Sequence, residues 1–249
     1  MTMDHATLGL LAVLALGGAT SAEATPSTQI WIPSTDIQPY KVLHLNIDAY
    51  LRTQDEDNGA RKGPLSMIGP TIGVLPTKQI QAETGFDLMY QGDKVLDNNP
   101  LYFHGKIGTP EKSLAEWSPA LAVGGYNIGT KNGYTNQDIV YGLAARTLPK
   151  LGRLSAGYYG GNGAVLRDEQ GHAANTGVLL SWDRTMKEIS DKLWFAVDYQ
   201  GGQSLVGSTN MGFSWAFSEK TSVLLGYDIY NDRAVAGKDT VTLQVDINL

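Results

Sequence analysis

The part of the chain from Lys192 to the C-terminal Leu249 alternates between apolar residues and small or polar residues with a period of two. The clearest segments are residues 193–200, 210–217 and 240–249. Successive side chains of a β-strand point to opposite sides of a sheet, so each segment is predicted to be a strand with one apolar face. A soluble β-sandwich has the same local pattern. A sheet that spans a membrane is the other architecture with this pattern. The number of strands, their connections and the N-terminal signals therefore have to decide between the soluble sandwich and the membrane-spanning sheet.

The same alternation runs through most of the remaining chain. It predicts further strands at residues 43–52, 67–76, 79–90, 101–107, 118–129, 139–146, 153–159, 178–183 and 223–230. The facing of the glycine-rich segment 118–129 is ambiguous. About twelve strands of roughly 9–12 residues result, which is the length that crosses a bilayer at a tilt. The 29 glycines and 12 tyrosines also favour a sheet protein over a helical membrane protein.

The connections between these strands alternate in length. Starting with the first connection, the odd-numbered ones tend to be longer: 53–66, 91–99, 130–136, 160–174, 201–208 and 231–238. Several even-numbered ones are tight: 76–78, 148–151 and 218–221. This asymmetry is typical of outer-membrane barrels, which have long outside loops and short periplasmic turns. An even number of strands then predicts that both termini are periplasmic.

The first 24 residues have the pattern of a secretory signal peptide. An apolar run from Ala6 to Gly18 is followed by small residues, and cleavage after Ala22 or Ala24 fits the small-x-small rule. A buried N-terminal helix is the alternative. Removing residues 1–24 changes the formal charge from −6 to −4, and this negative balance argues against a nucleic-acid partner. No other run approaches the about 18 apolar residues that a transmembrane helix needs.

Residues 25–40 contain three prolines, Pro26, Pro33 and Pro39, which break any long strand or helix. We interpret this segment as a periplasmic leader or as a short segment tucked into the mouth of a barrel. The predicted organisation is therefore a signal peptide at 1–24, a leader segment at 25–40 and a β-barrel domain at 41–249.

The mature chain resembles a bacterial outer-membrane β-barrel, and the resemblance covers residues 41–249. The phrases WIPSTDIQPY, LYFHGKIGTP and SDKLWFAVDYQGG are similar to porin-like outer-membrane proteins. The resemblance implies an all-β fold, a transmembrane antiparallel up-and-down barrel in the outer membrane of a Gram-negative cell. It also implies outer-membrane lipid and the barrel-assembly machinery as partners. The chain ends in Leu249 where such barrels end in Phe, but the apolar spacing of its last strand is intact.

If the apolar faces contact lipid, the opposite faces line a lumen. A soluble sandwich would instead risk exposing aromatic residues such as Phe213 and Trp215 to water. The predicted acidic lumen row is Asp48, Glu83, Asp87, Asp183, Asp198, Asp228 and Asp246, and the basic row is Arg52, Lys106, Arg146 and Arg153. This balance is mildly acidic and favours cations.

Two interpretations of the lumen charges stay open at this stage. Asp48, Asp87, Asp198 and Asp228 are predicted on strands that run the same way, near their outer ends, where they could form a partial ring that selects ions. Alternatively, each Asp pairs with a neighbouring Arg or Lys and fills the lumen.

The favoured function is a passive pore or channel for small polar solutes or ions, with a mild preference for cations. The main alternative is a structural or ligand-binding barrel with a lumen filled by side chains. A lipid hydrolase embedded in the barrel is disfavoured, because His44 and His104 are predicted on the lumen face and the chain has no G-x-S-x-G motif. We expect no enzyme activity, no cofactor and no metal site, and neither the solute nor the oligomeric state follows from the sequence.

Overall fold

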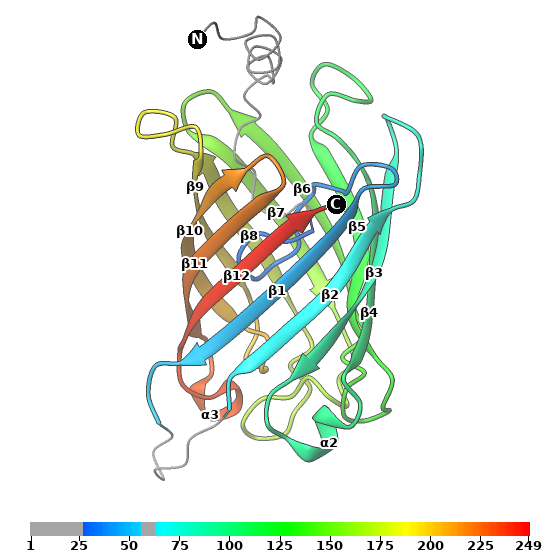
Figure 1. The fold of residues 1–249 in the computed structure, drawn as a ribbon. Coiled ribbons are helices and arrows are strands. Elements are labelled where there is room, and N and C mark those ends of the chain that lie inside the picture. Colours follow the sequence, from blue (N-terminus) through cyan, green and yellow to red (C-terminus); the bar gives the residue numbers. More distant parts are fainter. Residues whose placement is uncertain (1–26, 56–62) are drawn as a thin grey trace, which may run out of the picture.

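The computed structural model describes residues 27–55 and 63–249, which form a closed antiparallel barrel of twelve strands (Figure 1). The strands are β1 (Leu43–Arg52), β2 (Leu65–Gly73), β3 (Gln81–Tyr90), β4 (Leu101–Thr109), β5 (Ala120–Gly129), β6 (Ile139–Leu148), β7 (Gly152–Gly160), β8 (Thr176–Thr185), β9 (Leu193–Gln200), β10 (Ser208–Ser218), β11 (Thr221–Tyr230) and β12 (Thr240–Asn248). Each strand pairs with its neighbours in the sequence, and β12 returns to pair with β1. The predicted fold class and strand number are confirmed. The predicted signal peptide lies outside the described residues.

The connections differ between the two ends of the barrel. Those at the end of the C-terminus are 74–80, 110–119, 149–151, 186–192 and 219–220, whereas those at the other end tend to be longer (Figure 1). The short helices α2 (Lys94–Asp97) and α3 (Arg233–Ala236) lie in two of the longer connections and are capped by Asp93 and Asp232. In the described ranges, no helix is long and apolar enough to cross a membrane.

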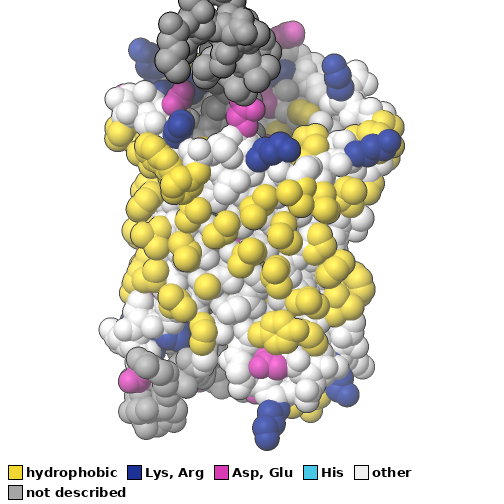
Figure 2. Space-filling view, in the orientation of Figure 1, with side chains coloured by type: hydrophobic (Ala, Val, Ile, Leu, Met, Phe, Trp, Pro, Cys, Tyr) yellow, Lys and Arg dark blue, Asp and Glu magenta, His cyan; other side chains and the backbone are white. Residues whose placement is uncertain are grey.

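On the face seen in Figure 2, the outer surface carries an apolar band across the middle of the barrel, with charged residues gathered toward its two ends. Residues that the alternation predicts to face outward are exposed there, including Ile47, Phe213 and Trp215. Their neighbours on the opposite face, such as Trp194 and Asp198, are buried inside. A band of this kind matches the hydrocarbon layer of a bilayer.

Strand β6 faces the opposite way from the sequence-based prediction. The alternation assigned Ile139, Tyr141 and Leu143 to the lipid side and Val140 to the lumen side. In the structure the first three are buried inside the barrel, and Val140 is 61% exposed. Both faces of this strand are largely apolar, so a period of two cannot decide which one faces lipid.

A segment of residues 27–39, here called the plug, runs inside the barrel and then leads into β1 (Figure 1). It makes a tight turn, in which the backbone N–H of Gln29 donates to the carbonyl of Ile32 at 2.8 Å, and that of Ser34 donates to the carbonyl of Ser27 at 3.2 Å. Ile30 and Ile32 are fully buried. Residues 25–40 are interpreted from the sequence either as a periplasmic leader or as a segment tucked into the mouth of the barrel. The described part of this segment lies inside the barrel.

Candidate functional site: the barrel interior

The turn of the plug is held by Asp198, one of the predicted lumen acids. Its carboxylate accepts hydrogen bonds from the backbone N–H groups of Ile30 and Trp31 at 2.8 and 2.9 Å, and from Asn210 Nδ2 at 2.6 Å. From the β12 side, Gln244 Nε2 donates to the carbonyl of Ile30 at 2.8 Å. Asp198 thus binds the protein's own backbone rather than standing free in the lumen.

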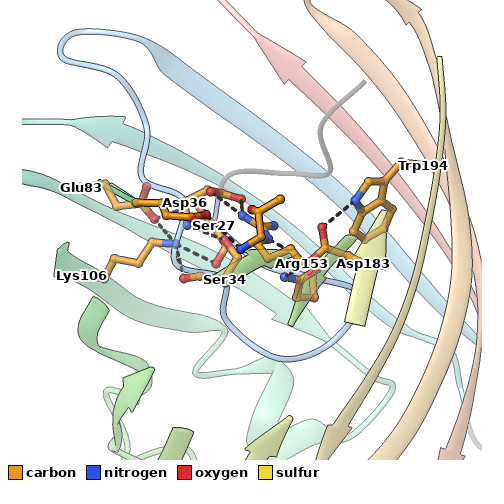
Figure 3. A network of polar contacts seen from close by, with 11 residues as sticks. Ser27, Ser34, Asp36, Glu83, Lys106, Arg153, Asp183 and Trp194 are labelled. Atoms are coloured by element: carbon orange, nitrogen blue, oxygen red, sulfur yellow. Dashed lines mark hydrogen bonds and ion pairs between the residues drawn. The ribbon is translucent and has the colours of Figure 1, made fainter. Parts of the chain in front are cut away.

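The base of the plug is held by Glu83 and Lys106, which lie 3.5 Å apart on β3 and β4 (Figure 3). Glu83 accepts hydrogen bonds from Ser27 Oγ at 2.8 Å and from the backbone N–H of Gln38 at 2.6 Å. Lys106 Nζ donates to the carbonyls of Ser27 and Ser34, both at 3.1 Å. A buried ion pair is tolerated when further hydrogen bonds offset the desolvation of both charges, and here the plug supplies them.

A second ion network ties the side of the plug to β7 and β8 (Figure 3). Arg153 donates from Nη1 to both carboxylate oxygens of Asp36, at 2.7 and 2.6 Å, and from Nε to Asp183 at 2.9 Å. Asp183 also accepts from Trp194 Nε1 and from Gln29 Nε2, each at 3.2 Å. Such charge-assisted hydrogen bonds are stronger than neutral ones and fix geometry.

Apolar side chains of the plug fill the side of the barrel built by β6 to β11. Ile32 belongs to a buried cluster with residues of β6, β7 and β8: Ile139, Tyr141, Leu143, Tyr159 and Leu179, together with Leu166 and Val206. Ile30 packs in a second cluster with Trp194, Ala196 and Leu224. This side of the lumen is therefore a packed core, and it explains why the inner face of β6 is apolar.

A cavity of about 200 Å³ lies on the other side, against β1 to β5, and part of its lining comes from the plug and β12. Its titratable and charged lining residues, tyrosines apart, are Asp48, Glu83, Asp87, Asp246, His44, His104 and Lys106. Its aromatic lining residues are Trp31, Tyr50, Tyr102, Tyr126 and Tyr141. Four of the seven predicted lumen acids thus share one cavity, whereas Asp183, Asp198 and Asp228 do not line it.

A hydrogen-bonded row crosses the cavity wall from β2 to β4. His104 Nδ1 lies 2.9 Å from the carboxylate of Asp87, and its Nε2 lies 2.8 Å from Thr71 Oγ1. Gly85 lies between Thr71 and His104 in the strand register, and a Cβ there would come within 2.4 Å of His104 Nε2. The glycine therefore makes room for the imidazole to reach the hydroxyl. Sequence reasoning missed Thr71, because its place beside His104 depends on the register of β2, β3 and β4.

Three other predicted lumen acids contact hydroxyl, amide or imidazole groups. Asp228 accepts from Thr240 Oγ1 at 2.7 Å, and Asp48 accepts from Asn46 Nδ2 at 3.3 Å. Asp246 accepts from Ser222 Oγ at 3.3 Å and lies 3.4 Å from His44 Nε2.

Two of the predicted lumen bases lie toward the ends of the barrel. Arg52 donates to the carbonyls of Ala236 and Lys238 in the connection before β12, and its guanidinium lies over the ring of Tyr230. Arg146 differs from the prediction, because β6 faces the other way. Its guanidinium bonds to Glu111 and to the carbonyls of Trp117 and Ser118 in the connection between β4 and β5.

In residues 27–55 and 63–249, no group of three His, Asp or Glu residues is placed to hold a metal ion. The interior instead offers carboxylates, imidazoles and aromatic rings around a cavity, and such groups interact with passing or bound solutes.

Comparison with known proteins agrees with this architecture. No family model matches the sequence, and no curated protein matches it. Among solved structures, the KdgM porin superimposes with a TM-score of 0.51 at 9% identity, over 83% of this chain and 99% of that one. The chain has a porin fold. An outer membrane channel from Pseudomonas putida F1 matches at 11% identity over 91% of this chain and all of that chain, with a TM-score of 0.47. The NanC porin matches at 10% identity over 82% and 98% of the two chains, also with a TM-score of 0.47. At these sequence identities, the similarity between this chain and the three solved structures concerns the fold alone.

Proposed function

We propose that this porin-like barrel is a passive channel of the outer membrane that admits small polar solutes or ions, with a mild preference for cations. The apolar outer band and the twelve-stranded closure support the membrane location. The cavity beside β1 to β5 supports the passage of solutes, because the β6 to β11 side of the lumen is packed against Ile30 and Ile32 of the plug. In the same proposal, both termini are periplasmic, an N-terminal signal peptide directs export, and the assembly machinery inserts the barrel.

The acidic lining of the cavity is the observation that carries this proposal. Four carboxylates line it, and Lys106 is its one lysine or arginine among the described residues. Lys106 is paired with Glu83, so Asp48, Asp87 and Asp246 remain without a lysine or arginine partner in the described ranges. Fixed negative charge along a narrow path lowers the energy of cations in it and raises that of anions.

A filled structural or ligand-binding barrel is the second candidate, and the plug favours it. The packing of Ile30 and Ile32 occupies much of the lumen without leaving room for solutes on that side. A hydrolase is less well supported. Thr71, His104 and Asp87 form a hydroxyl–imidazole–carboxylate chain, but Thr71 is only 2% exposed.

Planar-bilayer recordings on the purified barrel test the channel. We expect stepwise conductance and, in a KCl gradient, a reversal potential that indicates cation preference and strengthens at low salt, where screening is weaker. Replacing Asp48, Asp87 and Asp246 together by Asn removes charge but keeps shape, so selectivity should move toward anions with conductance nearly kept. Asp228→Asn is the matched control, because Asp228 is also buried but does not line the cavity. No current from the folded wild-type barrel would refute the channel and favour the filled barrel.

A further inference from the structure

Two neighbouring carboxylates on the cavity wall have oxygens without a hydrogen-bond partner. Asp48 is opposite Gln244 in the register and Asp246 is opposite Asn46, so the two acids are diagonal neighbours on β1 and β12. Such positions lie about 7–8 Å apart, and longer side chains bridge that distance. Asp48 is 8% exposed and Asp246 is 5% exposed. The Oδ1 atom of each is buried and accepts no hydrogen bond, and that of Asp246 lies 3.4 Å from His44 Nε2.

The described residues supply too little positive charge for this pair. His44 Nε2 lies 3.4 Å from Asp246, and a protonated imidazole there neutralises one carboxylate at most. The Lys106 ammonium is bound to Glu83 and to plug carbonyls. Two carboxylates held away from bulk water are costly unless one takes up a proton or a cation lies close to them. The pair is therefore suited to a guest that brings a positive charge.

Aromatic rings stand directly beside the acids. Tyr50 follows Asp48 by two residues on the same face of β1, and its ring meets that of Trp31 edge to face, with centroids 5.3 Å apart. Both rings line the same cavity as the two acids. Aromatic faces attract ammonium groups, and their apolar surface also favours an apolar body. The cavity of about 200 Å³ is somewhat larger than one of about 150 Å³ that holds benzene.

We propose that the cavity binds a small organic cation, a protonated amine carried on an apolar body about the size of one aromatic ring. The ammonium group lies between Asp48 and Asp246, and the apolar body lies against Trp31 and Tyr50. The inference rests on the proposed channel and names the class of solute that this channel recognises.

Calorimetric titration of the full-length folded barrel in detergent tests this site. The probe is 2-phenylethylammonium chloride, and its neutral isostere is 2-phenylethanol. We expect the amine to bind at least tenfold more tightly than the alcohol, and the Asp48→Asn/Asp246→Asn double variant to lose at least tenfold of that affinity. Asp228→Asn should keep it. Heat-modifiable migration on gels checks that each variant is folded.

Three results would overturn the inference. Equal affinity of the wild type for amine and alcohol removes the role of charge, and this result needs no variant. Unchanged amine binding in the folded double variant places the amine elsewhere. Displacement of the amine by an equal concentration of Na⁺ removes the role of the rings. Bilayer recordings separate this inference from the channel itself. Amine binding without current keeps the site and refutes the channel, whereas a cation-selective current without amine binding keeps the channel and refutes the site.

Discussion

The two sides of the lumen are built from strands of the same kind but have different interiors. Along β6 to β11, the inward residues pack against Ile30 and Ile32 of the plug as in a soluble protein core. Along β1 to β5, inward acids, histidines and aromatic rings surround a cavity. The outer surface shows no matching division, since the apolar residues Ile68 of β2 and Phe213 of β10 are both exposed. The difference between the two sides is therefore created by the plug. Its Ile30 and Ile32 pack against β6 to β11, whereas its polar contacts with Glu83 and Lys106 leave a cavity along β1 to β5.

This comparison separates the charged residues that hold the plug in place from those that a solute would contact. The plug is held by Asp198, Glu83, Lys106 and Arg153, so several charges predicted for the lumen serve as anchors for the chain itself. Asp48, Asp87 and Asp246 remain at the cavity. A charge count over the whole lumen therefore overstates the number of groups that can act on a solute.

The largest expected effect comes from expelling the plug. Replacing both Ile30 and Ile32 by Asp places two carboxylates in apolar clusters, where each unpaired charge costs roughly several kcal/mol. The plug should leave the lumen, and single-channel conductance should rise several-fold. Leu65→Asp/Met67→Asp, which adds the same charges at the cavity, is the control and should change conductance little. Equal conductance in both variants would show that the plug does not narrow the path.

Truncation inside the packed side should be costly for stability. Ile32→Ala should lower the free energy of unfolding by about 2–5 kcal/mol, because it leaves a hole in a core that cannot collapse. Met67→Ala should cost clearly less, because Met67 already lines a cavity. Urea unfolding in lipid vesicles measures both values. Similar losses would contradict the division of the lumen into a packed and an open side.

Arginine substitutions test the inner and outer faces of the wall together. On the lipid side, Phe213→Arg and Ile68→Arg should each cost about 2–4 kcal/mol near the mid-plane of the bilayer, although β10 belongs to the packed side and β2 to the side with the cavity. On the inner face the two sides should differ. Ser214→Arg would displace packed side chains, whereas Met67→Arg extends into the cavity. Heat-modifiable migration on gels measures the folded fraction of the four variants. Ser214→Arg should fold less well than Met67→Arg, and equal folding of these two would contradict the difference between the packed side and the side with the cavity.

The polar anchors of the plug should have a smaller effect than its apolar packing. Asp36→Asn removes one of the two carboxylates bonded to Arg153 and should cost about 1.5–3 kcal/mol, the usual value for a hydrogen bond to a charged group. Glu188→Gln breaks an exposed pair with Arg184 at 2.7 Å and should cost only about 0.3–0.5 kcal/mol. A loss at Asp36 as small as the control would mean that packing alone holds the plug.

Most of the wall could be predicted from the sequence, because the alternation of side chains is local. Strands β7 to β10 and β12 have one apolar face and one face that is mostly polar or small, so the facing of Tyr158 or Asp198 follows from the pattern. The alternating connections similarly predict which ends of neighbouring strands meet. The hydrogen-bond row of Thr71, His104 and Asp87 could not be predicted, because it depends on the register between three strands.

The amino-acid sequence alone determined that the chain forms about twelve alternating strands with an apolar outer face. Tertiary structure decided the facing of β6, the position of the plug and the division of the lumen. The physical reason is the same in each case: whether an apolar face such as that of Ile139 and Leu143 lies inside depends on what packs against it. Its partner Ile32 is far away in the sequence, and only the closed barrel brings the two together.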